Sequence, residues 1–150
     1  MFLDILLEHL TWKYHLRHIN STISRVLFSI KQVKHISPVE SLRTLYFAPI
    51  QQHLIHGILA WGRAYQSVVH KTELLQKRAI RTINKAKYNS HTEPLFKRSN
   101  ILKLKDLYEY QSSLFVYDFA NNRLPHSFDN TFVKSRKFVS PVKLILASGT

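Results

Sequence analysis

The sequence predicts a mainly α-helical fold, an irregular bundle of about four to five helices. Apolar residues recur at steps of three and four in several long stretches, the period that aligns them on one face of a helix. Hydrophobic residues make up 45% of the 150-residue chain, as in globular proteins. The chain has only 3 Gly, which argues against a turn-rich β fold. We therefore expect a helical region over residues 1–125 and an extended or partly disordered tail over residues 126–150.

The first part of the chain combines a short apolar segment with a long helix. Residues 2–10 are mostly apolar, and we expect a short strand or an irregular segment there. A helix should follow from Trp12, with Thr11 as its N-cap. Its apolar seam has alternating spacings of four and three residues and consists of Trp12, Leu16, Ile19, Ile23, Val26, Ile30 and Val33. The seam is too short for a stable coiled coil, so packing within the same domain is favoured over self-association.

A second helix is expected over residues 38–61. Ser37, Pro38 and Glu40 stand where an N-cap, a first-turn proline and a capping box require them. Pro49 lies inside the apolar pattern and lacks a backbone donor, so it should kink this helix. The second half of the segment carries almost no charge, which indicates the central core helix.

The remaining helices are separated by polar breaks. A third helix is expected over residues 68–87, and a short fourth one should begin at the capping sequence Thr92-Glu93-Pro94. A last helix is expected over residues 105–121 and should end before Pro125. No sustained period follows it, which is why the tail is expected to lack regular structure.

Charge is the strongest bulk signal. The chain has 22 Lys and Arg against 9 Asp and Glu, a net charge of +13. Residues 61–105 alone carry a net charge of +9. A basic block of this kind favours a polyanionic partner, because binding to phosphates releases counterions. The alternative is a solvated basic surface that only keeps the chain soluble.

The third helix carries much of this block on one face. At about 100° per residue, its apolar face consists of Leu75, Ala79, Ile80, Ile83 and Ala86. The opposite face is basic, with Lys87 just beyond its end. We therefore predict nucleic-acid binding by Lys71, Lys77, Arg78, Arg81, Lys85 and Lys87.

Residue patterns for catalysis are absent from the sequence. No two of the 9 acidic residues are adjacent, whereas two-metal phosphoryl transfer needs converging carboxylates. The chain has no Cys, and the pairs His15–His18 and His53–His56 have no evident third ligand, so packing or surface roles are favoured over a metal site. We expect no catalytic residue, no metal and no cofactor.

The start of the chain carries acids and has no basic region ahead of its apolar run, unlike a signal peptide. No apolar run approaches about 20 residues, so no membrane span is expected. We expect an intracellular protein, nuclear or cytoplasmic, that is not secreted.

Five segments together resemble the non-LTR (LINE, jockey-like) retrotransposon reverse transcriptases. They are Leu10-Thr11-Trp12-Lys13-Tyr14-His15, then Leu45-Tyr46 with Gly57 and Trp61-Gly62, then Leu75-Gln76-Lys77-Arg78-Ala79-Ile80-Arg81, then His91-Thr92-Glu93-Pro94-Leu95-Phe96, then Asn100-Ile101-Leu102-Lys103-Leu104-Lys105-Asp106-Leu107-Tyr108. The resemblance is to the thumb and the helical region behind the polymerase palm, and it covers most of residues 2–125.

The resemblance implies a parent RNA-directed DNA polymerase that uses magnesium. That family's catalytic Asp-Asp motif lies ahead of the first matched segment and does not occur here. We expect a truncated, non-catalytic copy whose remaining function is binding of RNA, DNA or a hybrid, since the family's thumb helices border the primer–template duplex. The alternatives are a helical protein–protein interaction module, self-associating through an exposed apolar seam, and a transposon-derived fragment without function.

Overall fold

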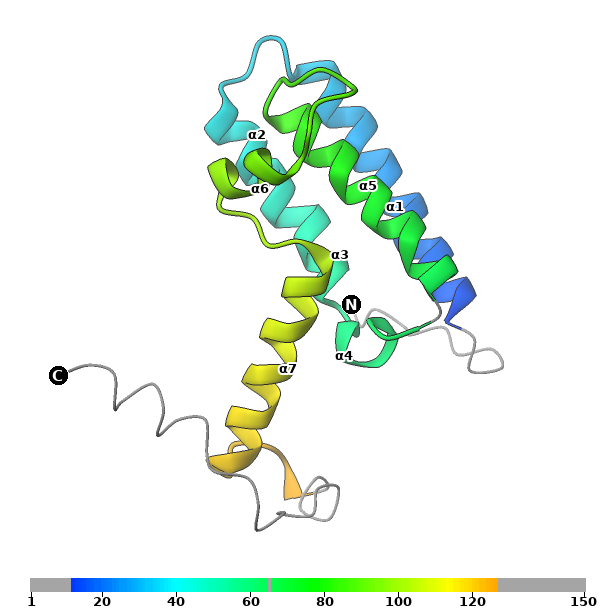
Figure 1. The fold of residues 1–150 in the computed structure, drawn as a ribbon, viewed down its shortest axis with the longest axis vertical. Helices are drawn as coiled ribbons and strands as arrows, with labels where there is room; N and C mark the ends of the chain where they lie inside the picture. Colours follow the sequence, from blue (N-terminus) through cyan, green and yellow to red (C-terminus); the bar gives the residue numbers. More distant parts are fainter. Residues whose placement is uncertain (1–11, 65, 127–150) are drawn as a thin grey trace, which may run out of the picture. The chain divides into compact units, whose positions relative to one another are not determined.

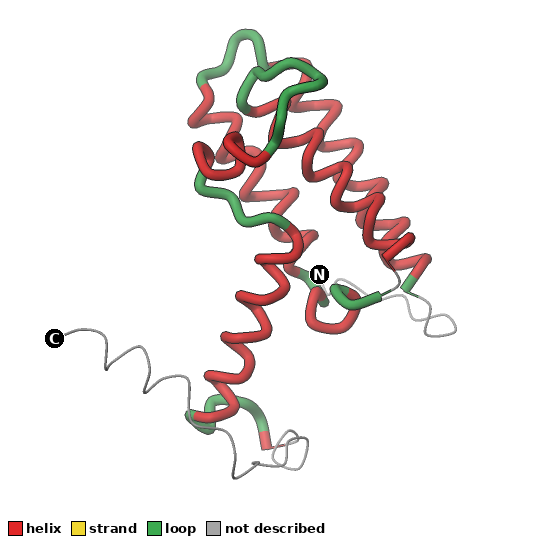
Figure 2. Tube along the Cα trace, in the orientation of Figure 1, coloured by secondary structure: helices red, strands yellow, loops and turns green. Residues whose placement is uncertain are grey.

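The computed structural model describes residues 12–64 and 66–126, which are mainly helical (Figure 1). These residues contain helices and turns but no strand (Figure 2), which confirms the predicted fold class. The elements are α1 (Lys13–Val33), α2 (Val39–Leu45), the π-helix η1 (Tyr46–Gln51), α3 (Gln52–Ile55), α4 (Ile58–Trp61), α5 (Gln66–Ile83), α6 (Glu93–Ser99) and α7 (Leu104–Ala120). The chain forms two compact units whose boundary lies within α7, between Ser113 and Leu114. The expected apolar segment at residues 2–10 and the tail beyond residue 126 lie outside the described residues.

Helices α1 and α5 lie side by side and run in the same direction (Figure 1). Thr72 of α5 donates a hydrogen bond to Asn20 of α1, with 2.8 Å between the two oxygen atoms. Four residues of the α1 seam, Leu16, Ile19, Ile23 and Ile30, are buried, and its other three members are partly buried and pack against the core. The expected packing within one domain is therefore confirmed. The alternative of an exposed seam is wrong, because the chain itself covers these side chains.

The expected helix over residues 38–61 is divided into four elements. It begins after Pro38, which is itself the N-cap, and no side chain caps it, so the predicted Ser37 cap is wrong. Around Pro49 the backbone widens into η1, a form that accommodates the missing donor and the proline ring. Gly57 then interrupts the helix, because its φ of 66° is a left-handed conformation, which glycine adopts readily. The expected distortion at Pro49 is confirmed, whereas the continuous helix is not.

The core of the first unit brings α1, η1, α3, α4 and α5 together with the segment that leads into α7. Its largest fully buried side chains are Trp61 and Tyr46. Burial raises the pKa of the Tyr46 hydroxyl to about 12. A phenol in this setting needs a hydrogen-bond partner inside the core.

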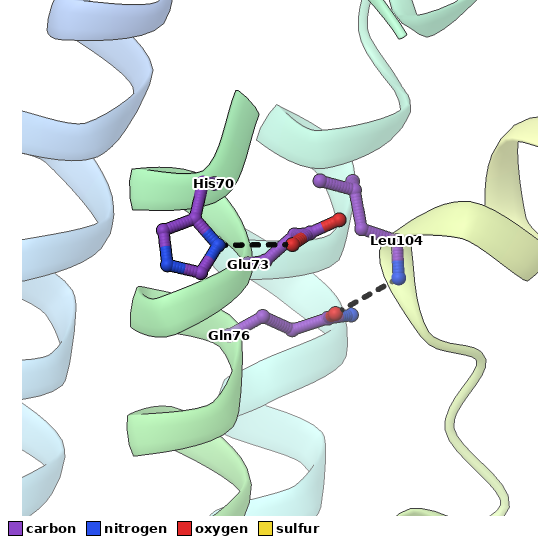
Figure 3. Close-up of polar contacts among 4 residues, drawn as sticks. All are labelled: His70, Glu73, Gln76 and Leu104. Atoms are coloured by element: carbon purple, nitrogen blue, oxygen red, sulfur yellow. Dashed lines mark hydrogen bonds and ion pairs between the residues drawn. The ribbon is translucent and has the colours of Figure 1, made fainter. Parts of the chain in front are cut away.

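Gln76 of α5 supplies that partner although it is a polar residue, and only 2% of it is exposed. Its amide nitrogen donates to the Tyr46 hydroxyl and to the carbonyl of Leu102, both at 2.9 Å. Its amide oxygen accepts from the backbone nitrogen of Leu104, also at 2.9 Å (Figure 3). One side chain thus joins α5, η1 and the start of α7.

No helix within residues 12–64 and 66–126 has the length and apolarity needed to cross a membrane.

Replacing Gln76 with Leu should lower the free energy of unfolding by about 2 kcal/mol or more, because the buried Tyr46 hydroxyl and Leu104 nitrogen and the partly buried Leu102 carbonyl lose their partner. Urea unfolding followed by circular dichroism measures this change. Gln32→Leu, at an exposed position of α1, is the control and should stay within about 0.5 kcal/mol of the parent. Equal effects of the two substitutions would contradict the role given to Gln76.

Stability should also depend on His15, which is only 3% exposed. Burial lowers its pKa from the ordinary 6.5, and the neighbouring His56 and His18 act in the same direction. The unfolded chain therefore binds this proton more readily than the folded chain does. The contribution to stability is present above about pH 6.5 and is lost as the pH falls below it. His15→Leu should reduce this loss in urea titrations between about pH 7 and 5, whereas His35→Leu, at an exposed position, should not.

Candidate nucleic-acid interface

All charged side chains of helix α1 are basic. Its 21 residues include no Asp or Glu and carry the cations Lys13, Arg17, Arg25 and Lys31. Lys13 and Lys31 are 18 residues apart, or five helical turns, so they project in the same direction. The charges along the edge of α1 next to α5 are therefore positive from the first turn of the helix to its last.

Two hollows lie along the line where α1 meets α5. The first, the loop hollow, has a volume of about 320 Å³ and is lined by Lys31, Lys34, Arg78, Arg81, Thr82, Ala86 and Tyr88. The second, the start hollow, has a volume of about 530 Å³ and is lined by Lys13, Leu16, Arg17, Asn20, Ser67, Val68 and Lys71. Neither set includes an acidic residue.

Both hollows follow the contact between α1 and α5. Lys71 and Arg78 are seven residues apart on α5, about two turns, and so lie on the same edge about 10 Å apart. The Thr72–Asn20 hydrogen bond joins the two helices at the start hollow, which Asn20 lines. We define the α1–α5 cationic groove as Lys13, Arg17, Lys31, Lys34, Lys71, Arg78 and Arg81.

In the part of the chain that the structure describes, none of the groove cations forms an ion pair. The ion pairs among residues 12–64 and 66–126 lie elsewhere, at His70–Glu73, Lys103–Glu93 and Arg123–Asp118. Glu73, the only acid of α5, pairs with His70 (Figure 3). Unpaired cations on both walls of a concave surface produce a positive potential that attracts anions.

Of the six residues predicted from sequence, the structure places Lys71, Arg78 and Arg81 in this groove. Lys77 instead lines a different hollow together with Lys103 and Lys105. The expected single basic face of the helix is therefore divided between two surfaces.

The two other predicted residues, Lys85 and Lys87, are exposed but lie beyond the helix, because α5 ends at Ile83 and not at Lys87 as expected. Three groove cations on α1, namely Lys13, Arg17 and Lys31, were missed, as was Lys34 at the C-cap of this helix. Their position on one edge of the seam is the sequence signal that could have found them.

The end of α5 is fixed by backbone hydrogen bonds. Lys85 has a φ of 53°, its nitrogen donates to the carbonyl of Thr82, and the nitrogen of Ala86 donates to the carbonyl of Arg81. These two bonds form a Schellman motif, in which the left-handed position is usually glycine. Arg81 also donates from Nε to the carbonyl of Ser90 at 2.9 Å. Arg81 therefore holds the loop as well as lining the groove.

Within the described part of the chain, no group of three or more His, Cys, Asp or Glu is placed to hold a metal ion. The His15 ring lies near the rings of Trp12 and His56, with centroid distances of 6.1 and 6.4 Å respectively. His15 is thus a core residue, as the packing interpretation predicted.

Comparison with known proteins gives no relative: no family model, no curated protein and no solved structure matches this chain.

Lys85→Gly should raise the free energy of unfolding by about 0.5–1 kcal/mol, because glycine adopts the left-handed conformation without the steric cost of a side chain. Thermal and urea unfolding measure the gain. Lys85→Ala removes the same charge but keeps a Cβ, and it should give no comparable gain. If the two variants are equally stable, the motif does not impose strain at this position.

Proposed function

We propose that this chain binds nucleic acid without sequence specificity, by contacting phosphates through the α1–α5 cationic groove. The observation that carries the proposal is the gathering of seven cations, from two segments far apart in sequence, in two hollows along the contact between α1 and α5 whose linings include no acid. Lys and Arg contacts to phosphates supply most of the affinity of such binding. Recognition of a base sequence would instead need polar side chains that reach the base edges in the grooves of the nucleic acid.

The length of the groove suits an extended polyanion. Lys13 and Lys34 are 21 residues apart, which corresponds to about 30 Å along a helix. That distance equals the rise of about nine nucleotides of a B-form strand. A small anion would use one hollow, whereas a nucleic-acid strand can contact both.

We further propose that the chain derives from the thumb and post-palm region of a non-LTR reverse transcriptase and has no polymerase activity of its own. The order of the five similar segments supports this origin. The order of the acids in the sequence supports the absence of catalysis, since no two of them are adjacent, unlike the Asp-Asp motif of the parent family. RNA, DNA and their hybrid all present the phosphates that the groove requires.

The experiment is a fluorescence anisotropy titration of a labelled duplex and a labelled single strand at several salt concentrations. The triple variant Lys31→Glu/Lys34→Glu/Arg78→Glu should weaken binding and reduce the magnitude of the log–log salt slope by about 2–3, because three phosphate contacts are lost. Arg81 is left unchanged because it also holds the loop.

The matched control is Lys97→Glu/Arg98→Glu/Lys105→Glu, which changes the net charge equally at exposed positions away from the groove. It should keep most of the affinity and of the salt slope. If the two triple variants lose affinity equally, the contact is a general charge effect and not a property of the groove. Binding that does not respond to salt would refute the proposal.

A further inference from the structure

The loop hollow contains one residue that phosphate binding does not explain. Tyr88 lines it beside four cations and is 81% exposed. By contrast, Tyr46 is buried in the core, and the ring of Tyr108 lies over Gly62. A large aromatic side chain left in water beside Lys31, Lys34, Arg78 and Arg81 is available to a ligand.

The backbone around Tyr88 is held on both sides. Before it, the Schellman motif at Lys85 closes α5. After it, the nitrogen of Ser90 donates to the carbonyl of Lys87, and the Ser90 carbonyl accepts from Arg81 Nε. Tyr88 is thus presented at the tip of a turn that is anchored to a groove cation. Such preorganisation reduces the entropic cost of binding.

Proteins that bind single-stranded nucleic acids combine an exposed aromatic ring with phosphate-binding cations. The cations follow the backbone, while an unpaired base stacks on the ring. In a duplex the base faces are already stacked on their neighbours, so a surface ring cannot reach them without unstacking. The same arrangement therefore distinguishes the two forms of nucleic acid.

We infer that the loop hollow is a nucleotide site for single-stranded nucleic acid, in which Tyr88 stacks on a base and the surrounding cations bind the adjacent phosphates. This inference rests on the proposed function and deepens it by selecting the single strand over the duplex. DNA and RNA both offer the phosphates and the base faces, so both are used in the test.

The test compares four probes with the full chain: oligothymidylate, oligouridylate, a duplex of equal length, and an abasic strand with the same number of phosphates. The parent should bind the two single strands more tightly than the duplex. Tyr88→Ala should weaken single-strand binding by about fivefold or more, the usual effect of losing one stacked base. Tyr88→Phe should bind like the parent, because stacking needs the ring and not the hydroxyl.

Two controls isolate the stacking contact. Binding of the abasic strand should be the same for Tyr88→Ala and the parent, since it offers no base. Tyr110→Ala, which removes another exposed tyrosine, should leave single-strand binding unchanged. Circular dichroism verifies that all variants remain folded.

The outcomes separate the two proposals. If binding is salt-dependent but Tyr88→Ala binds single strands as the parent does, or if the duplex is preferred, the stacking inference is overturned and the cationic groove stands. If no probe shows salt-dependent binding, the proposed function fails and the stacking inference fails with it.

Discussion

The first unit depends on how one buried amide is satisfied. Gln76 uses both amide hydrogens, toward the Tyr46 hydroxyl and the Leu102 carbonyl, and its oxygen accepts from the nitrogen of Leu104. Inside a core each of these groups would be costly without its partner. Together the three bonds fix one edge of α5 against η1 and the start of α7. One turn earlier on the same face of α5, Thr72 bonds to Asn20 of α1. Polar bonds made from this buried face therefore hold α5 against α1, and with it the position of the cationic groove.

This arrangement shows what the helical period could and could not predict. The α1 seam was identified correctly, because its leucines and isoleucines lie where a period of 3.6 places them and are buried. On α5, Ala79, Ile80 and Ile83 are buried as predicted, but the buried face also includes Thr72 and Gln76. A glutamine in a helix usually faces solvent, so sequence alone assigns it to the surface. Its partners come from residues about 30 positions away in either direction, and no local pattern reveals them.

Helix boundaries were predicted less well for a related reason. Pro49 was identified as a distortion, yet the form of the distortion, a π-helix, depends on how the surrounding core accommodates the wider turn. Gly57 lies inside the expected helix, and its left-handed conformation at the N-cap of α4 separates α3 from α4. At the end of α5 a lysine occupies the position that sequence rules reserve for glycine. The backbone bonds to Thr82 and Arg81 outweigh the preference of the single residue, so the predicted helix was four residues too long.

The groove is a property of pairing rather than of either helix alone. Counting charge along the sequence finds the block around α5, because its cations lie within one window. It misses α1, whose cations are diluted by apolar residues, although that helix contains no acid at all. Only when the two helices pack in the same direction do Lys31 and Lys34 come beside Arg78 and Arg81. The pairing also separates Lys77 from the others, since the turn that brings Arg78 toward α1 carries its neighbour to the opposite edge. The apolar period of one helix distinguishes its buried residues from its exposed ones. To assign exposed residues of two helices to a common surface, the packing of the two helices must be known.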